Sequence, residues 1–99
     1  MLPFERLVQL NTKENLWIYV LSLLREKELY GYQIPKIIEK RFGFKPGKIT
    51  PYRVLYRLEN KGFVQSEIRN RKRIYRITKK GREELEKAKR FYKQIIGIL

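Results

Sequence analysis

The apolar side chains between Thr50 and Gly62 recur at helical spacing, and both ends of the stretch carry terminating residues. The apolar positions are Pro51, Val54, Leu55 and Leu58. They predict a helix over residues 50–61 with one buried face. Thr50 is expected to cap this helix, because its hydroxyl can accept an unpaired backbone N–H, and Gly62 can adopt the left-handed conformation that ends it. The opposite face carries Arg53, Tyr56, Arg57 and Asn60. Such side chains can bind phosphates and read base edges, so we interpret this helix as a DNA recognition helix. The alternative is an ordinary helix whose polar face is only solvated.

Two helical patterns open the chain. Residues 1–9 favour a short helix, and a longer helix is expected over residues 12–27, where Asn11 and Glu14 have the spacing of a capping box. The longer pattern is apolar over more than half of its circumference. One helix of a small domain rarely buries so wide a face alone, so part of this face should contact another element or a partner chain.

A third helical pattern lies directly before the recognition helix. It covers residues 31–42, follows an expected connection over residues 28–30, and is separated from residues 50–61 by a glycine- and proline-containing turn over residues 43–47. Two helices, a tight turn and a further helix are the order of a helix-turn-helix.

The hydrophobic period changes from helical to two after Gly62. Residues 63–68 and 73–78 alternate, which predicts a two-stranded hairpin with Asn70 in its turn. Its tip gathers the cations Arg69, Arg71, Lys72 and Arg73. Because like charges on one loop repel each other, this cluster favours contact with phosphates over the alternative of a merely solvated turn.

The last helical pattern is expected over residues 79–97, with Thr78 as its cap. Its apolar seam, expected at a dimer interface, consists of Leu85, Ala88, Tyr92, Ile95, Ile96 and Leu99. The seam should pack against the first long helix near Trp17, from a second chain or, as the alternative, only within the same chain. Trp17 is then a core or interface residue, with a stacking platform for a flat aromatic ligand as its alternative role.

Composition removes most catalytic chemistry. The chain of 99 residues has neither Cys nor His, and all ten acidic residues are Glu. Thiol nucleophiles, histidine acid–base chemistry and zinc-finger ligands are therefore excluded, and we expect neither an enzyme nor a cofactor or metal site. Apolar runs fall short of the roughly 20 residues that a membrane span needs, and the first ten residues lack a signal-peptide core, so a cytoplasmic protein is expected.

The excess positive charge is concentrated in the middle of the chain. The net charge is +14, and thirteen of these fourteen charges lie between residues 31 and 82. A positive field of this density repels itself and indicates a polyanionic partner. The basic region is not one long amphipathic helix, so a lipid surface fits less well than a nucleic acid.

The order of elements is that of a winged helix-turn-helix followed by a long terminal helix, and three motifs resemble the PadR-like transcriptional regulators. The first motif is Gly31-Tyr32 at the start of the third helix. The second comprises Thr50, Tyr52, Leu55, Leu58, Glu59 and Gly62-Phe63-Val64, and the third is Tyr75-Arg76-Ile77-Thr78-Lys79-Lys80-Gly81. The resemblance covers about residues 16–85. It implies a homodimeric repressor, released from DNA by small aromatic or lipophilic compounds near the dimer interface, which offers Trp17 a role.

These observations predict a mainly α, α+β fold over one domain, residues 1–99, with the winged helix over about 12–78 and a dimerisation helix over 79–99. The residues expected to contact DNA are Lys45, Lys48, Thr50, Tyr52, Arg53, Tyr56, Arg57, Asn60, Arg71, Lys72 and Arg73. The expected partner is double-stranded DNA. A winged-helix RNA-binding or ribosome-associated protein is the main alternative, and a protein–protein module is a third.

Overall fold

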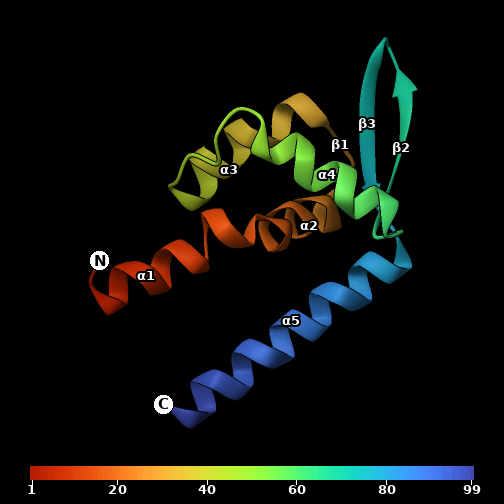
Figure 1. Cartoon of the computed structure of the whole chain (residues 1–99). Helices are drawn as coiled ribbons and strands as arrows, with labels where there is room; N and C mark the ends of the chain where they lie inside the picture. Colours follow the sequence, from red (N-terminus) through yellow and green to blue (C-terminus); the bar gives the residue numbers. More distant parts are fainter.

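The computed structural model describes residues 1–99 and contains five helices and three short strands (Figure 1). The helices are α1 (Pro3–Leu10), α2 (Leu16–Glu26), α3 (Ile34–Phe42), α4 (Thr50–Asn60) and α5 (Lys79–Ile98). The strands are β1 (Leu29–Tyr30), β2 (Val64–Arg69) and β3 (Lys72–Ile77), and 3₁₀ turns cover Lys13–Asn15 and Gly31–Gln33. Helices α3 and α4 form the helix-turn-helix, and β2 and β3 form the wing. The predicted winged helix-turn-helix is confirmed.

The sheet is antiparallel, with the strand order β1-β3-β2. The predicted hairpin is present, and its two-residue turn is Asn70-Arg71, both with positive φ angles of 55° and 62°. Two left-handed residues in succession match the twist of the flanking strands. The expectation of a plain connection over residues 28–30 is wrong, because Leu29 and Tyr30 form strand β1, in which Leu29 pairs with Tyr75 of β3. Two residues are too few to show an alternating pattern in the sequence.

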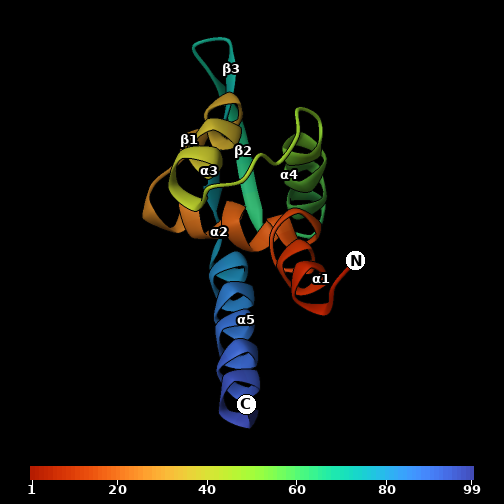
Figure 2. The ribbon, with the colours of Figure 1, turned by 90° about the vertical axis from the view of Figure 1, so that its left-hand side faces the viewer.

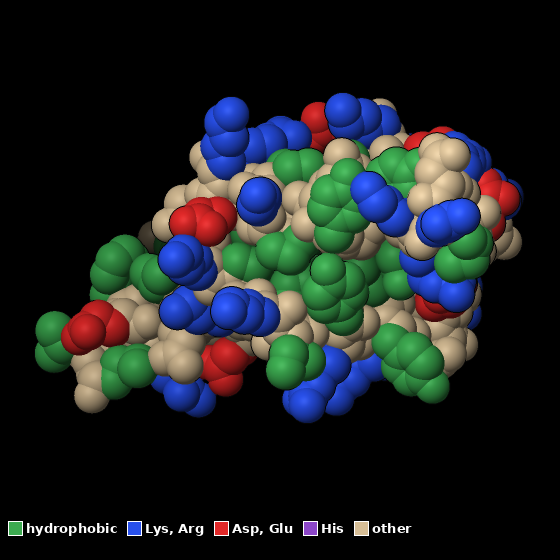
Figure 3. Space-filling view, turned by 90° about the horizontal axis from the view of Figure 1, so that it is seen from above, with side chains coloured by type: hydrophobic (Ala, Val, Ile, Leu, Met, Phe, Trp, Pro, Cys, Tyr) green, Lys and Arg blue, Asp and Glu red, His purple; other side chains and the backbone are tan.

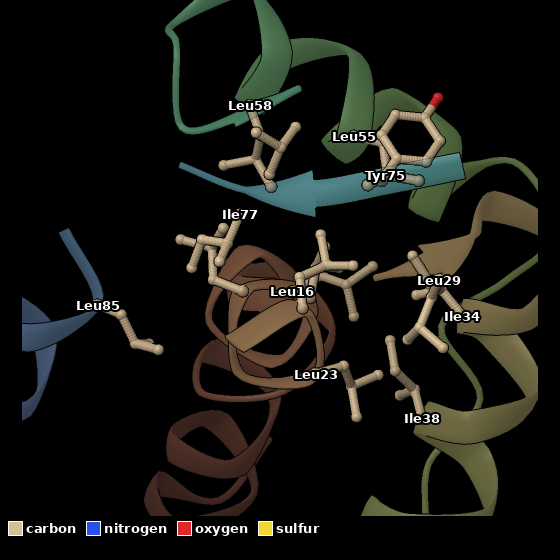
Figure 4. Close-up of a cluster of buried hydrophobic side chains, with 14 residues drawn as sticks. Leu16, Leu23, Leu29, Ile34, Ile38, Leu55, Leu58, Tyr75, Ile77 and Leu85 are labelled. Carbon is tan, nitrogen blue, oxygen red and sulfur yellow. The ribbon is translucent and has the colours of Figure 1, made fainter. Parts of the chain in front are cut away.

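Helix α2 lies at the centre of the hydrophobic core (Figure 4). Val20 and Leu21 are fully buried, and α2 packs against α3, α4, α5 and β3. Leu55 and Leu58 reach this core from α4, and Leu85 reaches it from α5. The wide apolar face of α2 is thus largely covered within one chain, and the core fixes the positions of α4 and the sheet.

Two of the three predicted N-terminal helix caps are wrong. Thr50 is the first residue of α4 and makes no capping bond, because the carbonyl of Ile49 already accepts the N–H groups of Tyr52 and Arg53. Asn11 does not cap α2, which begins only at Leu16 after a 3₁₀ turn. Its side-chain amide instead donates to the carbonyl of Leu7 at the end of α1. Thr78 caps α5 as predicted, and its hydroxyl accepts the N–H of Gly81 at 3.0 Å.

Helices α1 and α5 form two arms on the side of the molecule opposite the wing (Figure 2). Leu85, expected in a dimer seam, is instead buried in the core of its own chain, with 3% of its surface exposed. The hydroxyl of Tyr92 donates to Asn11 Oδ1 at 2.8 Å and accepts from Asn15 at 3.1 Å, which joins α5 to the start of the chain. None of the five helices combines the length and the apolar character that crossing a bilayer requires.

Candidate nucleic-acid interface

The two faces of α4 differ as the spacing of its side chains dictates. Pro51, Leu55 and Leu58 are buried against the core. The other face is open, and Tyr52 and Tyr56 are 47% and 67% exposed. The predicted contact residues on this helix are all exposed: Thr50, Tyr52, Arg53, Tyr56, Arg57 and Asn60. The helix therefore presents tyrosine, arginine and asparagine side chains together on one accessible surface.

The cations of this surface have no acidic partner. No carboxylate lies within 4.0 Å of Arg53 or Arg57, or of Lys45 and Lys48 in the exposed loop before α4. The one carboxylate of α4 belongs to Glu59, and it is turned toward β2. Figure 3, viewed from above, shows Lys and Arg side chains around exposed hydrophobic groups, with fewer carboxylates. The surface is thus positively charged and free to bind an anion.

The four cations at the tip of the wing, Arg69, Arg71, Lys72 and Arg73, have different surroundings. Arg69 is neutralised, because it bonds to Glu28 at 2.7 Å and also to Glu67, and these bonds raise its pKa above the ordinary value. The tip therefore has three cations without an acidic partner, where the sequence suggested four. Lys72 holds its ammonium 4.8 Å from the ring centre of Tyr32. Arg71 lies in the exposed turn, without a carboxylate or hydrogen-bond partner in the chain.

Two tyrosines that were not predicted as site residues attach the wing to the helix-turn-helix. Tyr30 and Tyr32 stack with ring centres 5.9 Å apart, and Asn70 donates to the Tyr30 hydroxyl at 3.3 Å. Gly31 lies between them, and a Cβ there would be 3.1 Å from the Tyr75 ring and 3.5 Å from the Tyr52 ring. The Gly31-Tyr32 pair in the sequence pointed to this place, but its contact with the wing requires β1, which was not predicted.

The side of the wing nearest α4 carries a buried tyrosine. Tyr75 is 8% exposed, and its burial, followed by the nearby charge of Glu59, raises its pKa above the ordinary value. The charge of Arg73 opposes that shift. Tyr75 therefore packs as a neutral side chain between the helix-turn-helix and the wing, close to both charged groups.

Trp17 does not lie in the core proper. It is half-buried and lines a hollow of about 490 Å³ between the start of α2, one flank of α4 and α5. Val54, Arg57 and Phe63 line the same hollow. The hollow thus places the ring of Trp17 on the same surface as Arg57 of α4.

The fold and this basic face define the class of the winged helix-turn-helix transcriptional regulators. The family model described as "Transcriptional regulator PadR-like family" matches residues 20–87. The chain therefore belongs to the PadR-like family of transcriptional regulators. Among curated protein sequences, no significant match was found.

Solved structures from bacteria show the same architecture. A PadR family transcription regulator from Clostridium difficile is 30% identical, with a TM-score of 0.76 over 83% of this chain and 91% of that chain. A transcriptional regulator from Clostridium thermocellum is 28% identical, with a TM-score of 0.78 over 83% and 84% of the two chains. Bacillus subtilis PadR, solved in complex with operator DNA, is 32% identical, with a TM-score of 0.62 over 73% of this chain and 45% of that one.

Proposed function

We propose that this protein is a homodimeric, cytoplasmic repressor that binds a pseudopalindromic site in double-stranded DNA. The observation that carries the proposal is the exposed face of α4 together with the wing residues Arg71, Lys72 and Arg73, because none of these cations has an acidic partner. A binding protein of this kind needs no catalytic group. The operator complex of Bacillus subtilis PadR supports duplex DNA as the ligand.

In this proposal α4 enters the major groove. Arg53 and Arg57 contact guanine edges or flanking phosphates, and Asn60 contacts a base near the end of the helix. The hydroxyls of Tyr52 and Tyr56 donate to phosphates. The remaining contacts come from the flanks of the helix and from the wing: Lys45, Lys48, Thr50, Arg71, Lys72 and Arg73.

The second copy is proposed to bind along α1 and α5. Phe4 of α1, Ile96 of α5 and Leu99, which directly follows α5, are exposed, although each is strongly apolar. A hollow of about 590 Å³ lies between α1, α2 and α5 and is lined by Leu7, Val8, Ile18, Tyr19 and Ile95, among others. An apolar helix face from a second chain fits this surface, and Ala88, Tyr92, Ile95, Ile96 and Leu99 remain its expected contributors on α5.

A small aromatic or lipophilic effector is proposed for the hollow beside Trp17. Its walls are partly aromatic and aliphatic, and Arg57 lies on one of them. A ligand there would compete for a side chain that the proposal assigns to DNA. Trp17 is the only tryptophan, so quenching of its fluorescence by an added aromatic compound reports on this site alone. Unchanged fluorescence across a panel of such compounds would remove the effector from the proposal.

The test is equilibrium binding to duplex DNA over a series of salt concentrations. Wild-type protein should bind a duplex selected from random sequences and prefer it to structured RNA. Arg57→Ala should lose mainly the selected duplex, by about tenfold or more, because a bidentate base contact gives about 1–3 kcal/mol of discrimination. Arg71→Ala should weaken all duplexes alike and reduce the log–log salt slope by about 0.9.

The matched control is Lys93→Ala, which removes the same charge from an exposed position far along α5. This variant should bind as wild type does. Preference for RNA, or equal effects of Arg57→Ala, Arg71→Ala and Lys93→Ala, would contradict the proposal.

A further inference from the structure

The carboxylate of Glu59 connects the recognition helix to the wing. It lies in the last turn of α4 and accepts two hydrogen bonds from Ser66 of β2, from the backbone N–H at 3.1 Å and from the hydroxyl at 2.7 Å. Glu59 and Ser66 are both only partly exposed. A charge-assisted pair of this kind is stronger than a bond between neutral groups, so it restrains the angle between α4 and β2.

The same hydroxyl continues the connection into the second strand of the wing. Ser66 Oγ accepts a hydrogen bond from Arg73 Nη1 at 3.0 Å. In the register of the hairpin Ser66 pairs with Tyr75, so Arg73 is its diagonal neighbour on the same face of the sheet. Glu59, Ser66 and Arg73 thus form a helix-to-wing bridge that spans α4, β2 and β3.

The bridge orients Arg73 without neutralising it. No carboxylate lies within 4.0 Å of its guanidinium, which is exposed and has further N–H donors beyond the one that Ser66 accepts. Arg69, on the same hairpin, is held by two glutamates instead. Arg73 is therefore fixed in place and still able to bind an anion.

The bridge faces the recognition helix. Tyr75, two residues from Arg73 on the same face, packs beside Gly31, and the ring of Tyr52 from α4 lies close by. Along β3, Arg73 lies between Tyr75, which packs close to α4, and the turn at Arg71. We therefore expect a duplex that contacts both α4 and the turn to bring a phosphate close to Arg73.

We propose that Glu59 and Ser66 are positioning residues, which hold Arg73 between the recognition helix and the wing so that it binds one DNA phosphate. The inference rests on the proposed function. It assigns to Glu59, which itself does not contact DNA, the role of positioning Arg73 through Ser66. Its energetic basis is preorganisation, because an arginine that is already ordered loses less entropy when it binds. A two-stranded hairpin is marginally stable alone, so the restraint from α4 also keeps the wing at one angle.

The experiment measures affinity for a duplex selected by the wild-type protein and for a random-sequence duplex of equal length. Arg73→Ala should weaken both by about tenfold, as expected for a charge-assisted bond. Ser66→Ala should weaken both by about fivefold, because it removes the acceptor for Arg73. The decisive measurement is the double variant, since positioning predicts that Arg73→Ala costs less than about threefold once Ser66 is alanine.

Two further variants separate positioning from stability. Glu59→Gln keeps an acceptor for Ser66 and should retain most of the affinity, whereas Glu59→Ala should match Ser66→Ala. Gln65→Ala is the matched control, because it removes a β2 side chain that bonds to Arg76 and is not part of the bridge. Melting curves of each variant confirm that the protein is folded.

The outcomes distinguish this inference from the proposed function. If the wild type binds neither duplex, the proposed function fails and the bridge has no role in DNA binding. If the wild type binds and Arg73→Ala costs the same tenfold with serine or alanine at position 66, the positioning role is overturned. Equal losses for Gln65→Ala and Ser66→Ala would overturn it as well.

Discussion

Gly81 lies at the start of α5, where the backbone passes very close to the segment after α4. A Cβ at this position would be 2.1 Å from the carbonyl oxygen of Phe63 and 2.8 Å from Ile77 Cγ1. Backbone cannot move aside as a flexible side chain can. The glycine of the third motif is therefore required by packing between α5 and the base of the wing.

Gly81→Ala should consequently destabilise the protein by about 3 kcal/mol, through overpacking of a buried contact. Gly97→Ala on the same helix is the control, because nothing lies within 4 Å of a Cβ there. It should be neutral or slightly stabilising. Urea titration of both variants measures the difference, and similar stabilities would show that α5 does not approach Phe63 this closely.

Tyr75 links the stability of the protein to alkaline pH. Its pKa in the folded state is raised above the ordinary 10.0, first by burial and then by the charge of Glu59. As the pH rises past 10.0, the unfolded chain releases this proton before the folded chain does. The folded state then binds more protons, so this group's contribution to stability is intact below that pH and is lost above it.

Tyr75→Phe should therefore reduce the fall in unfolding free energy between about pH 8 and pH 11. The wild-type protein, measured over the same pH range, is the reference. Unfolding in denaturant at a series of pH values provides the comparison. Equal slopes for wild type and Tyr75→Phe would argue against a buried hydroxyl at the base of the wing.

At the scale of elements, α5 divides into two parts with different surroundings. Leu85 belongs to the core of the chain, whereas Ile96 is 70% exposed. One helix thus carries an apolar side chain that is buried within its own chain and, further along the sequence, an apolar side chain that is exposed. The apolar seam alone could not distinguish them, because both kinds of contact require the same residue types at the same spacing.

Ile96→Glu should dissociate the proposed dimer, since it places a charge in an apolar interface. Gln94→Glu introduces the same charge at an exposed position of the same helix and should remain dimeric. Light scattering at micromolar concentration gives the masses. A wild-type monomer, or dimers in all three proteins, would contradict an interface on this part of α5.

The elements with a regular pattern were predictable, and those decided by single hydrogen bonds were not. Helix α4 and the hairpin follow from periodicity and from glycine and asparagine at their ends. The prediction of a cap at Thr50 was wrong, because a cap contributes only about 1 kcal/mol. The carbonyl of Ile49 accepts the N–H groups of the first turn instead. The contact of Glu59 with Ser66 crosses a turn, so neither a helical nor a strand period indicates it.

At the scale of the whole molecule, the basic face and the exposed apolar arms lie on different sides. The wing extends in one direction and the end of α5 in the other (Figure 2). Two copies joined through their arms could therefore present two recognition helices to one duplex without covering either. For such a dimer we expect half-sites about 34 Å apart, which is one helical turn of DNA.

The most direct test of the account is to map which groove each element reaches. The chain has no cysteine, so Asn60→Cys and Arg71→Cys each create one attachment point for an iron–EDTA cleavage reagent. Reagent at position 60 should cut within the major groove of the selected duplex. Reagent at position 71 should cut about half a helical turn, roughly 5 base pairs, away in the flanking minor groove. Reagent at Lys93→Cys should cut nowhere. Cutting from position 93, or identical patterns from positions 60 and 71, would contradict the placement of α4 and the wing on DNA.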